Sequence, residues 1–151
     1  MNKLLFRIFI VIGCCFASLA FAASPCPMEL ATVTLNISGK QLTTEIAADN
    51  ASRRCGLSQR QRLAENNAML FVYPYPLKLS FWMKDTHIAL SIAFLDNDGR
   101  ILNIQQMVPL RTDVSYSSPS PARYALEVNQ GWFKVHDIKV GDTVEIPKNL
   151  R

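Results

Sequence analysis

The chain has 151 residues, of which 49% are hydrophobic and 19% charged, and a formal net charge of +4. This length suits one ordinary domain that can bury its own core. The first 22 residues hold two of the positive charges and no negative one, so the rest of the chain carries only +2. A balance so near neutrality gives no support to a nucleic-acid partner, because such proteins carry a concentrated basic surface.

The N-terminus is typical of an export signal. Lys3 and Arg7 precede an uncharged apolar run over residues 8–19, and Ala20-Phe21-Ala22 offers small residues at both positions that a signal peptidase reads. We expect residues 1–22 to be a signal peptide and the protein to be periplasmic or secreted. No second run of about 18 apolar residues follows, so we expect no stable membrane span after cleavage.

Two other interpretations of the N-terminus stay open. The signal stays uncleaved as an anchor in one of them, and in the other Cys14 is lipid-modified, because Val11-Ile12-Gly13-Cys14 loosely resembles the box of bacterial lipoproteins. Behind the signal we expect an extended leader over residues 23–29 and a single domain over residues 30–151.

Two cysteines remain after the signal, Cys26 and Cys55. An oxidising compartment favours a single disulfide between them. The alternative is a pair of free thiols, because the sequence does not give the distance between the two residues.

The first half of the chain predicts a hairpin, two short helices and a strand. Apolar alternation over residues 33–37 and 42–46, around a turn at Ser38-Gly39-Lys40, indicates the hairpin. Asp49 is placed to cap a helix over residues 50–55, and Ser58 with Gln61 matches a capping box for a further helical turn or two. The strand is expected over residues 69–73, ended by Pro74 and Pro76.

The second half predicts more strands. Apolar runs over residues 90–95 and 101–107 flank the turn Asp96-Asn97-Asp98-Gly99 and indicate a central hairpin. A loop is expected over residues 109–121, and residues 123–129 alternate again, with Tyr124, Leu126 and Val128 on one face. One helical turn at residues 131–133 and two short strands within residues 138–146 complete the chain. Together these elements predict an all-β domain, a compact barrel or jelly-roll-like sandwich with one or two short helices.

Five ordered segments are similar to the domain of unknown function 192 (DUF192) family. They are GLSQR at 56–60, AMLFVY at 68–73, FWMKDT at 81–86, SIAFLDNDGRI at 91–101, and YALEVNQGWF at 124–133 followed by IKVGDTV. The resemblance covers roughly residues 30–147. It implies a mainly β fold of the jelly-roll kind, frequent export signals and no established activity.

Glu127 and Lys84 are the two residues we select as a candidate site. Glu127 lies mid-strand among polar neighbours, where side chains either face water or line a cavity, and Lys84 directly follows three bulky apolar residues. We hypothesise that the two pair in a ligand pocket with aromatic walls and a few convergent polar groups. The other candidate lining residues are Trp82, Thr86, Tyr116, Arg123, Asn129 and Trp132.

No residue is assigned a catalytic role, because no nucleophile elbow is present and the cysteines are expected to be paired. The predicted function is an exported, non-catalytic binding domain for a small molecule or an envelope protein, with no cofactor. One alternative is a hydrolase or isomerase that uses Glu127 with Lys84 or His87. A second alternative is copper binding, because thioether and imidazole ligands suit this metal; the residues are Met28, Met69, Met83, Met107, His87 and His136.

Overall fold

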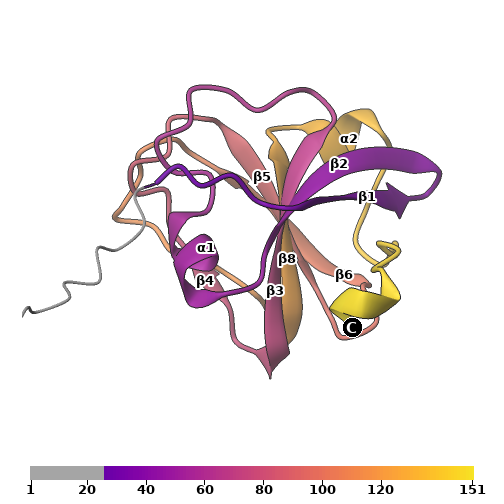
Figure 1. Cartoon of the computed structure of the whole chain (residues 1–151). Helices are drawn as coiled ribbons and strands as arrows, with labels where there is room; N and C mark the ends of the chain where they lie inside the picture. The colour runs from indigo at the N-terminus through magenta and orange to yellow at the C-terminus, as the bar shows by residue number, and fades with distance from the viewer. Residues whose placement is uncertain (1–25) are drawn as a thin grey trace, which may run out of the picture.

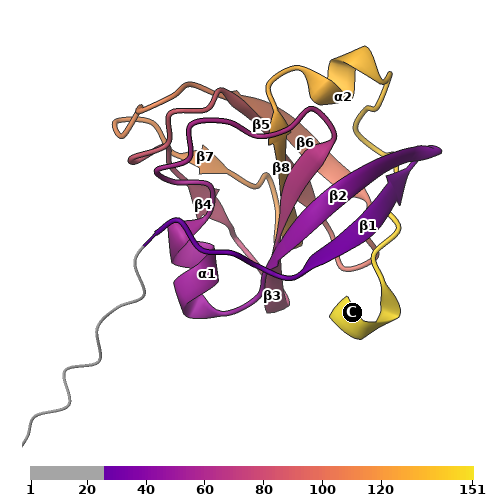
Figure 2. The same ribbon diagram turned by 45° about the horizontal axis from the view of Figure 1, so that its top comes forward.

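A computed structural model describes residues 26–151 (Figures 1 and 2). The predicted signal peptide and cleavage site lie outside these residues. The strands are β1 (Thr32–Ile37), β2 (Lys40–Ala47), β3 (Asn67–Leu77), β4 (Ser80–Phe81), β5 (Leu90–Leu95), β6 (Ile101–Met107), β7 (Tyr116–Ser117) and β8 (Ala122–Asn129). Three short helical segments accompany them, α1 (Asn50–Cys55), α2 (Trp132–Val135) and a 3-10 turn, η1 (Lys148–Leu150). None of the helices in this part of the chain is long and apolar enough to span a membrane.

Six strands form one mixed sheet in the order β1-β2-β3-β8-β5-β6, and β4 pairs with β7 separately. All pairs in the large sheet are antiparallel except β2 with β3. The prediction of an all-β fold with short helices is confirmed. The sheet is open, and the C-terminal segment links its two edges only by single bridges, from Val144 to Ile37 and from Thr143 to Arg100.

The large sheet is buried on both faces. The first core lies on the face covered by α2 and the C-terminal segment, and it includes Tyr124, Leu126 and Val128 of β8. The second core lies on the opposite face, beneath α1, β4 and β7, and it includes Met69, Phe71, Ile92 and Ala125. Figures 1 and 2 show α1 and β4 on one side of the sheet and α2 and the C-terminus on the other. The faces of β8 therefore alternate as predicted.

Local turn and capping chemistry explains the elements that were predicted correctly. The Asp49 side chain accepts hydrogen bonds from the Ala51 and Ser52 amides at 2.8 and 2.9 Å, and the Ser52 hydroxyl accepts one from the Asp49 amide at 3.2 Å. This capping box begins α1, and Gly56 ends it with φ 51°. Both predicted hairpins form, as β1–β2 and β5–β6.

Two predictions for the middle of the chain are wrong. No helix follows Ser58, because Gln59 adopts left-handed backbone angles with φ 61° and its amide donates to the Asp85 carbonyl instead. The prolines do not end β3 either. Pro74 and Pro76 fall in a stretch where the pairing with β8 shifts register, between Val72 and Leu77, so the regular ladder does not need their missing N–H groups.

Two further predictions need correction near the C-terminus. The segment over residues 109–121 is not all loop, because it contains β7. No strands form within residues 138–146, because neighbouring residues there donate hydrogen bonds to two different segments. The Val144 amide donates to the Gly99 carbonyl and the Glu145 amide donates to the Asn36 carbonyl, each at 2.9 Å.

Candidate functional site

Four of the predicted site residues line one pocket of about 160 Å³ over the second core. They are Glu127 from β8 and Trp82, Lys84 and Thr86 from the segment after β4. We call this cavity the Glu127 pocket. Its remaining lining residues come from α1, from the turn that follows it, from β3, from β4 and from the segment after β4: Arg53, Arg54, Cys55, Gly56, Leu57, Ser58, Phe71, Tyr73, Ser80, Phe81 and Met83.

Glu127 occupies the middle of the sheet. Its register neighbours are Met69 on β3 and Ile92 on β5, both completely buried in the second core. Glu127 itself is only 5% exposed, and it is the one charged residue among the buried side chains of the described chain. Within residues 26–151 its carboxyl group has no hydrogen-bond or ion-pair partner.

Burial raises the pKa of Glu127 from an ordinary 4.5 to about 8. The cause is desolvation, which disfavours the carboxylate because no cation or hydrogen-bond donor compensates it. The carboxyl group is therefore mostly protonated at neutral pH, and it can both donate and accept a hydrogen bond.

Tyr73 and Arg53 form the wall between Glu127 and α1. The pKa of the Tyr73 phenol is raised, mainly because the phenol is buried. The charge of Arg53 lowers this pKa and a charge on Glu127 raises it, so both groups lie within electrostatic range of the phenol. The Arg53 guanidinium lies 4.8 Å from the centre of the Tyr73 ring. It also donates to the Val72 carbonyl at 2.8 Å, so it fastens α1 to β3.

Lys84 and Glu127 share the pocket but do not form the predicted pair. Lys84 is exposed, and its ammonium lies 5.6 Å from the ring centre of Trp82. No ion pair joins it to Glu127 in the described residues. The Lys84 ammonium stays at the exposed mouth of the pocket, whereas the Glu127 carboxyl group is buried at its base.

The loops around the pocket mouth hold strained backbone. Gln59, Asp85 and Leu110 have φ of 61°, 54° and 60°, in the left-handed region that such residues rarely adopt. Their loops are joined by hydrogen bonds: the Gln59 amide donates to Asp85 at 2.6 Å, and the Leu110 amide donates to Thr86 at 3.0 Å. Strain of this kind persists only where surrounding contacts enforce it, and it gathers at functional sites.

The other four predicted lining residues lie elsewhere. Tyr116 is buried in β7, where its hydroxyl accepts from the Val108 amide at 2.9 Å. Arg123 donates to the Tyr73 carbonyl at 3.3 Å and to Asn97 at 2.9 Å, at the far end of β8. Asn129 and Trp132 line a separate hollow with His136, whose ring stacks on Trp132 with centres 4.3 Å apart.

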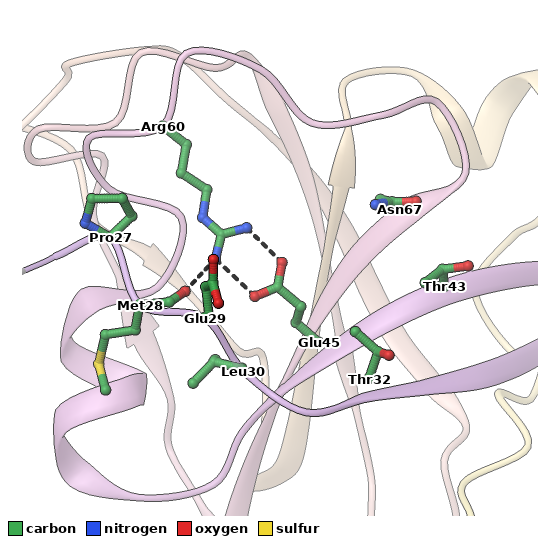
Figure 3. A pocket seen from close by; sticks show the side chains of 9 residues that line it. All are labelled: Pro27, Met28, Glu29, Leu30, Thr32, Thr43, Glu45, Arg60 and Asn67. Atoms are coloured by element: carbon green, nitrogen blue, oxygen red, sulfur yellow. Dashed lines mark hydrogen bonds and ion pairs between the residues drawn. The ribbon is translucent and has the colours of Figure 1, made fainter.

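A larger hollow of about 530 Å³ lies beside the leader, and we call it the leader hollow (Figure 3). Arg60 reaches across it and donates to both Glu45 carboxylate oxygens and to the Met28 carbonyl. Glu45 is thus paired with Arg60, and the other acid that lines this hollow, Glu29, is exposed. The hollow therefore has no buried, unpaired carboxyl group comparable to Glu127. The Glu127 pocket is for this reason the better candidate.

The residues considered for copper do not share a pocket. Met28 lines the leader hollow, Met83 lines the Glu127 pocket and His136 lines the hollow near Trp132. Met69 and Met107 are completely buried in the second core. The described residues also contain no group of three or more His, Cys, Asp and Glu side chains placed to hold a metal ion.

The sequence reasoning missed the contribution of α1. Arg53 and Arg54 are not among the predicted site residues, yet both line the Glu127 pocket. The sequence feature that draws attention to these arginines is Cys55, which ends the same helix. Cys55 is joined to Cys26 by a disulfide with Cα atoms 5.5 Å apart. His87, proposed as a catalytic partner, is exposed and does not line the pocket.

Comparisons with known proteins agree on a family without an assigned activity. The model of the DUF192 family, described as an uncharacterized ACR, matches residues 32–146. The chain is 31% identical to a crystal structure from Sinorhizobium meliloti 1021, described as a "putative transcription regulator", over 79% of this chain and 96% of that one, with a TM-score of 0.75. It is also 31% identical to a protein of unknown function from Novosphingobium aromaticivorans DSM 12444, over 83% of this chain and 91% of that one, with a TM-score of 0.75. A comparison with curated proteins gives no match. With a family model that spans most of its length, the chain belongs to the DUF192 family.

Proposed function

We propose that this chain is an exported, non-catalytic binding domain and that the Glu127 pocket holds a small molecule. The observation that carries the proposal is the buried Glu127 carboxyl group without a partner in the described chain. Desolvation disfavours the charged form of this group, and no donor or cation of the described chain compensates it. A ligand that hydrogen-bonds the carboxyl group supplies a reason for a glutamate at this position.

The size and lining of the pocket favour a small ligand. Its volume of 160 Å³ is well below the roughly 300–1,000 Å³ typical of drug-sized ligands. Phe71, Tyr73, Phe81 and Trp82 give it aromatic walls, and Glu127, Lys84 and Arg54 give it a few polar groups. This combination is typical of ligand sites.

Export is the second part of the proposal. It is supported by the signal-like composition of residues 1–22 and by the Cys26–Cys55 disulfide, because disulfides persist in oxidising compartments such as the periplasm. The ligand would then be a periplasmic or extracellular compound. An envelope protein as partner remains the alternative.

A thermal-shift screen tests the binding proposal. The purified, oxidised protein is screened against periplasmic metabolites, cell-wall fragments and nucleotides, alongside the variants Glu127→Gln and Lys84→Ala. A ligand at 100 times its dissociation constant stabilises the fold by about 2.7 kcal/mol, a shift of several degrees for a domain of this size. His87→Ala is the matched control, since His87 is exposed and outside the pocket.

We expect a ligand that shifts the parent and the His87 variant but not the Glu127 variant. A ligand that shifts all variants equally would place binding elsewhere. No shift with any compound, from a well-folded parent, would contradict a small-molecule site and turn the search to an envelope protein.

An enzyme is the second candidate, and one observation favours it. A carboxyl group with a pKa of about 8 is suited to general acid–base work near neutral pH. Incubating each ligand found by the screen with the parent and with Glu127→Gln, and following the compound by mass spectrometry, separates the two functions. Conversion by the parent alone would establish an enzyme, whereas unchanged compound supports binding.

A further inference from the structure

The Glu127 pocket is lined by a buried acid and by exposed cations. Glu127 lies at the base, and Arg54 and Lys84 are exposed lining residues at the mouth. Neither cation forms a side-chain hydrogen bond or an ion pair within residues 26–151, where the only ion pairs are Arg60–Glu45 and Arg111–Asp113. The pocket therefore offers an unpaired acid inside and two unpaired cations outside.

Arg53 does not belong to this unpaired set. Its guanidinium donates to the Ala48 and Val72 carbonyls and to the Asn50 side chain, and it stacks on Tyr73. Its hydrogen-bonding capacity is largely used in holding α1 against β3. A ligand anion at the mouth would instead meet Arg54 and Lys84.

Aromatic rings also line the pocket. Phe71 and Phe81 meet edge to face with ring centres 4.9 Å apart, and Tyr73 and Trp82 complete the wall. Aromatic faces attract cations through their quadrupole, and they exclude water from an ion pair behind them. The wall thus suits an ammonium group on its way to Glu127.

We infer that the Glu127 pocket binds a small zwitterion of the free amino-acid class, with its ammonium group on Glu127 and its carboxylate on Arg54 and Lys84. This inference rests on the proposed function. A simple amine would be repelled by the two mouth cations, and a simple anion would offer no positive group to the Glu127 carboxylate. A molecule with both charges, small enough for the pocket, satisfies both ends.

The inference predicts that a proton is released when the ligand binds. The charged and titratable groups that line the pocket with Glu127 are Tyr73 on β3, Arg53 and Arg54 on α1, and Lys84 after β4, and none of them pairs with its carboxyl group. Burial raises the pKa of Glu127 to about 8, so its carboxyl group carries a proton at pH 7 before a ligand binds. An ammonium ligand requires the carboxylate, and binding therefore releases close to one proton per ligand.

Isothermal titration calorimetry at pH 7 with a panel of free L-amino acids tests the inference. The two controls for the amino acid that binds most tightly are its N-acetyl derivative, which lacks the ammonium group, and its decarboxylated amine, which lacks the anion. We expect each control to bind about tenfold more weakly or worse, because a hydrogen bond to a charged group contributes about 1.5–3 kcal/mol. Heats in two buffers of different ionisation enthalpy give the proton release, which we expect to be near one for the parent.

Binding by substituted proteins tests which residues hold the ammonium group and which hold the carboxylate. Glu127→Gln should weaken the amino acid about tenfold or more and abolish the proton release, whereas Arg54→Ala and Lys84→Ala should weaken the amino acid but not its decarboxylated amine. The proton count on the parent needs no variant, so the test stands even where a variant folds poorly.

Three outcomes would overturn the inference. The first is an amino acid that binds without proton release, and the second is equal binding of the N-acetyl derivative. In the third outcome, the thermal-shift screen finds a ligand whose binding requires Glu127, but no amino acid binds. That outcome would refute the zwitterion and leave the pocket itself supported. Failure of every compound in both experiments would refute the pocket as well.

Discussion

Two glutamates show how the environment decides the chemistry of one residue type. Glu45 lies on β2 beside Arg60, whose guanidinium donates to both carboxylate oxygens. Glu127 lies on β8 between Met69 and Ile92 and has no such partner in the described chain. The first glutamate is neutralised within the protein, and the second is left as a buried acid facing a cavity.

The raised pKa of Glu127 predicts a pH-dependent stability that Glu127→Gln removes. The folded-state pKa of about 8 lies above the ordinary 4.5, so between these values the folded state holds a proton that the unfolded state has lost. The free energy of unfolding should therefore fall as pH rises from 5 to 8, by at most about 1.4 kcal/mol per pH unit from this group, and level off above pH 8. The measurement is urea unfolding of the parent and of Glu127→Gln at pH 5, 6, 7 and 8. The difference in free energy of unfolding between the two proteins gives the contribution of Glu127 at each pH. A difference that stays constant over this range would show that Glu127 is not a buried, unpaired acid.

The sequence could indicate this residue but not its surroundings. Alternation along β8 placed Glu127 opposite Tyr124, Leu126 and Val128, and the structure has it there. Alternation alone does not distinguish a face toward water from a face toward a second core. That distinction depends on α1 and the loops that cover the sheet, which lie far from Glu127 in sequence.

At the scale of elements, two hairpin turns depend on glycine for different reasons. Gly39, between β1 and β2, has φ 79° and open space where a side chain would stand. Gly99, between β5 and β6, has φ 85°, and an added Cβ would lie 2.4 Å from the Val144 carbonyl oxygen. The second turn is thus packed against the C-terminal segment, while the first is free.

Replacing each glycine by alanine separates backbone strain from steric clash. Both positions have positive φ, which alanine rarely adopts, so both variants should lose about 1 kcal/mol or more of stability. Gly99→Ala should lose a further 1–3 kcal/mol, roughly, because the Val144 carbonyl must move. Equilibrium urea unfolding of both variants gives the comparison, and equal losses would show that the C-terminal segment does not pack on this turn.

The elements predicted correctly are those with local causes. Asp49 and Gly56 bound α1 by capping, and the turns at residues 38–40 and 96–99 set the two hairpins. The wrong predictions involve distant partners. The segment after Ser58 is held by Asp85, and residues 143–145 divide their hydrogen bonds between β1 and the turn before β6, which no local pattern reveals.

At the scale of the whole molecule, the sheet separates two cores and the disulfide ties the leader to the second of them. Cys55 ends α1 and lines the Glu127 pocket, while Cys26 begins the described chain. The sequence allowed a pairing of Cys26 with Cys55 to be predicted. The meeting of α1, β3 and the Trp82–Lys84 segment around one cavity is a property of the tertiary fold. This is why Lys84 and Glu127 could be selected in advance while Arg54 was not.

Loss of the disulfide should lower global stability. The bridge joins residues separated by 29 positions, and the chain-entropy relation for a loop of this length gives about 3–4 kcal/mol. The double variant Cys26→Ser/Cys55→Ser should lose this amount in urea unfolding, and the parent under reducing conditions should match it. An unchanged midpoint in both would contradict a stabilising bridge.

Glu127 is a buried acid without a hydrogen-bond or ion-pair partner among the described residues, and we propose that a ligand supplies one. A carbon-13 NMR titration of the Glu127 carboxyl group, assigned by comparison with Glu127→Gln, tests it most directly. We predict a pKa of about 8 for the free protein and a carboxylate signal at pH 7 once a zwitterionic ligand is bound. A pKa near the ordinary 4.5 in the free protein would mean that water or another group already satisfies this carboxyl group, and it would contradict the account.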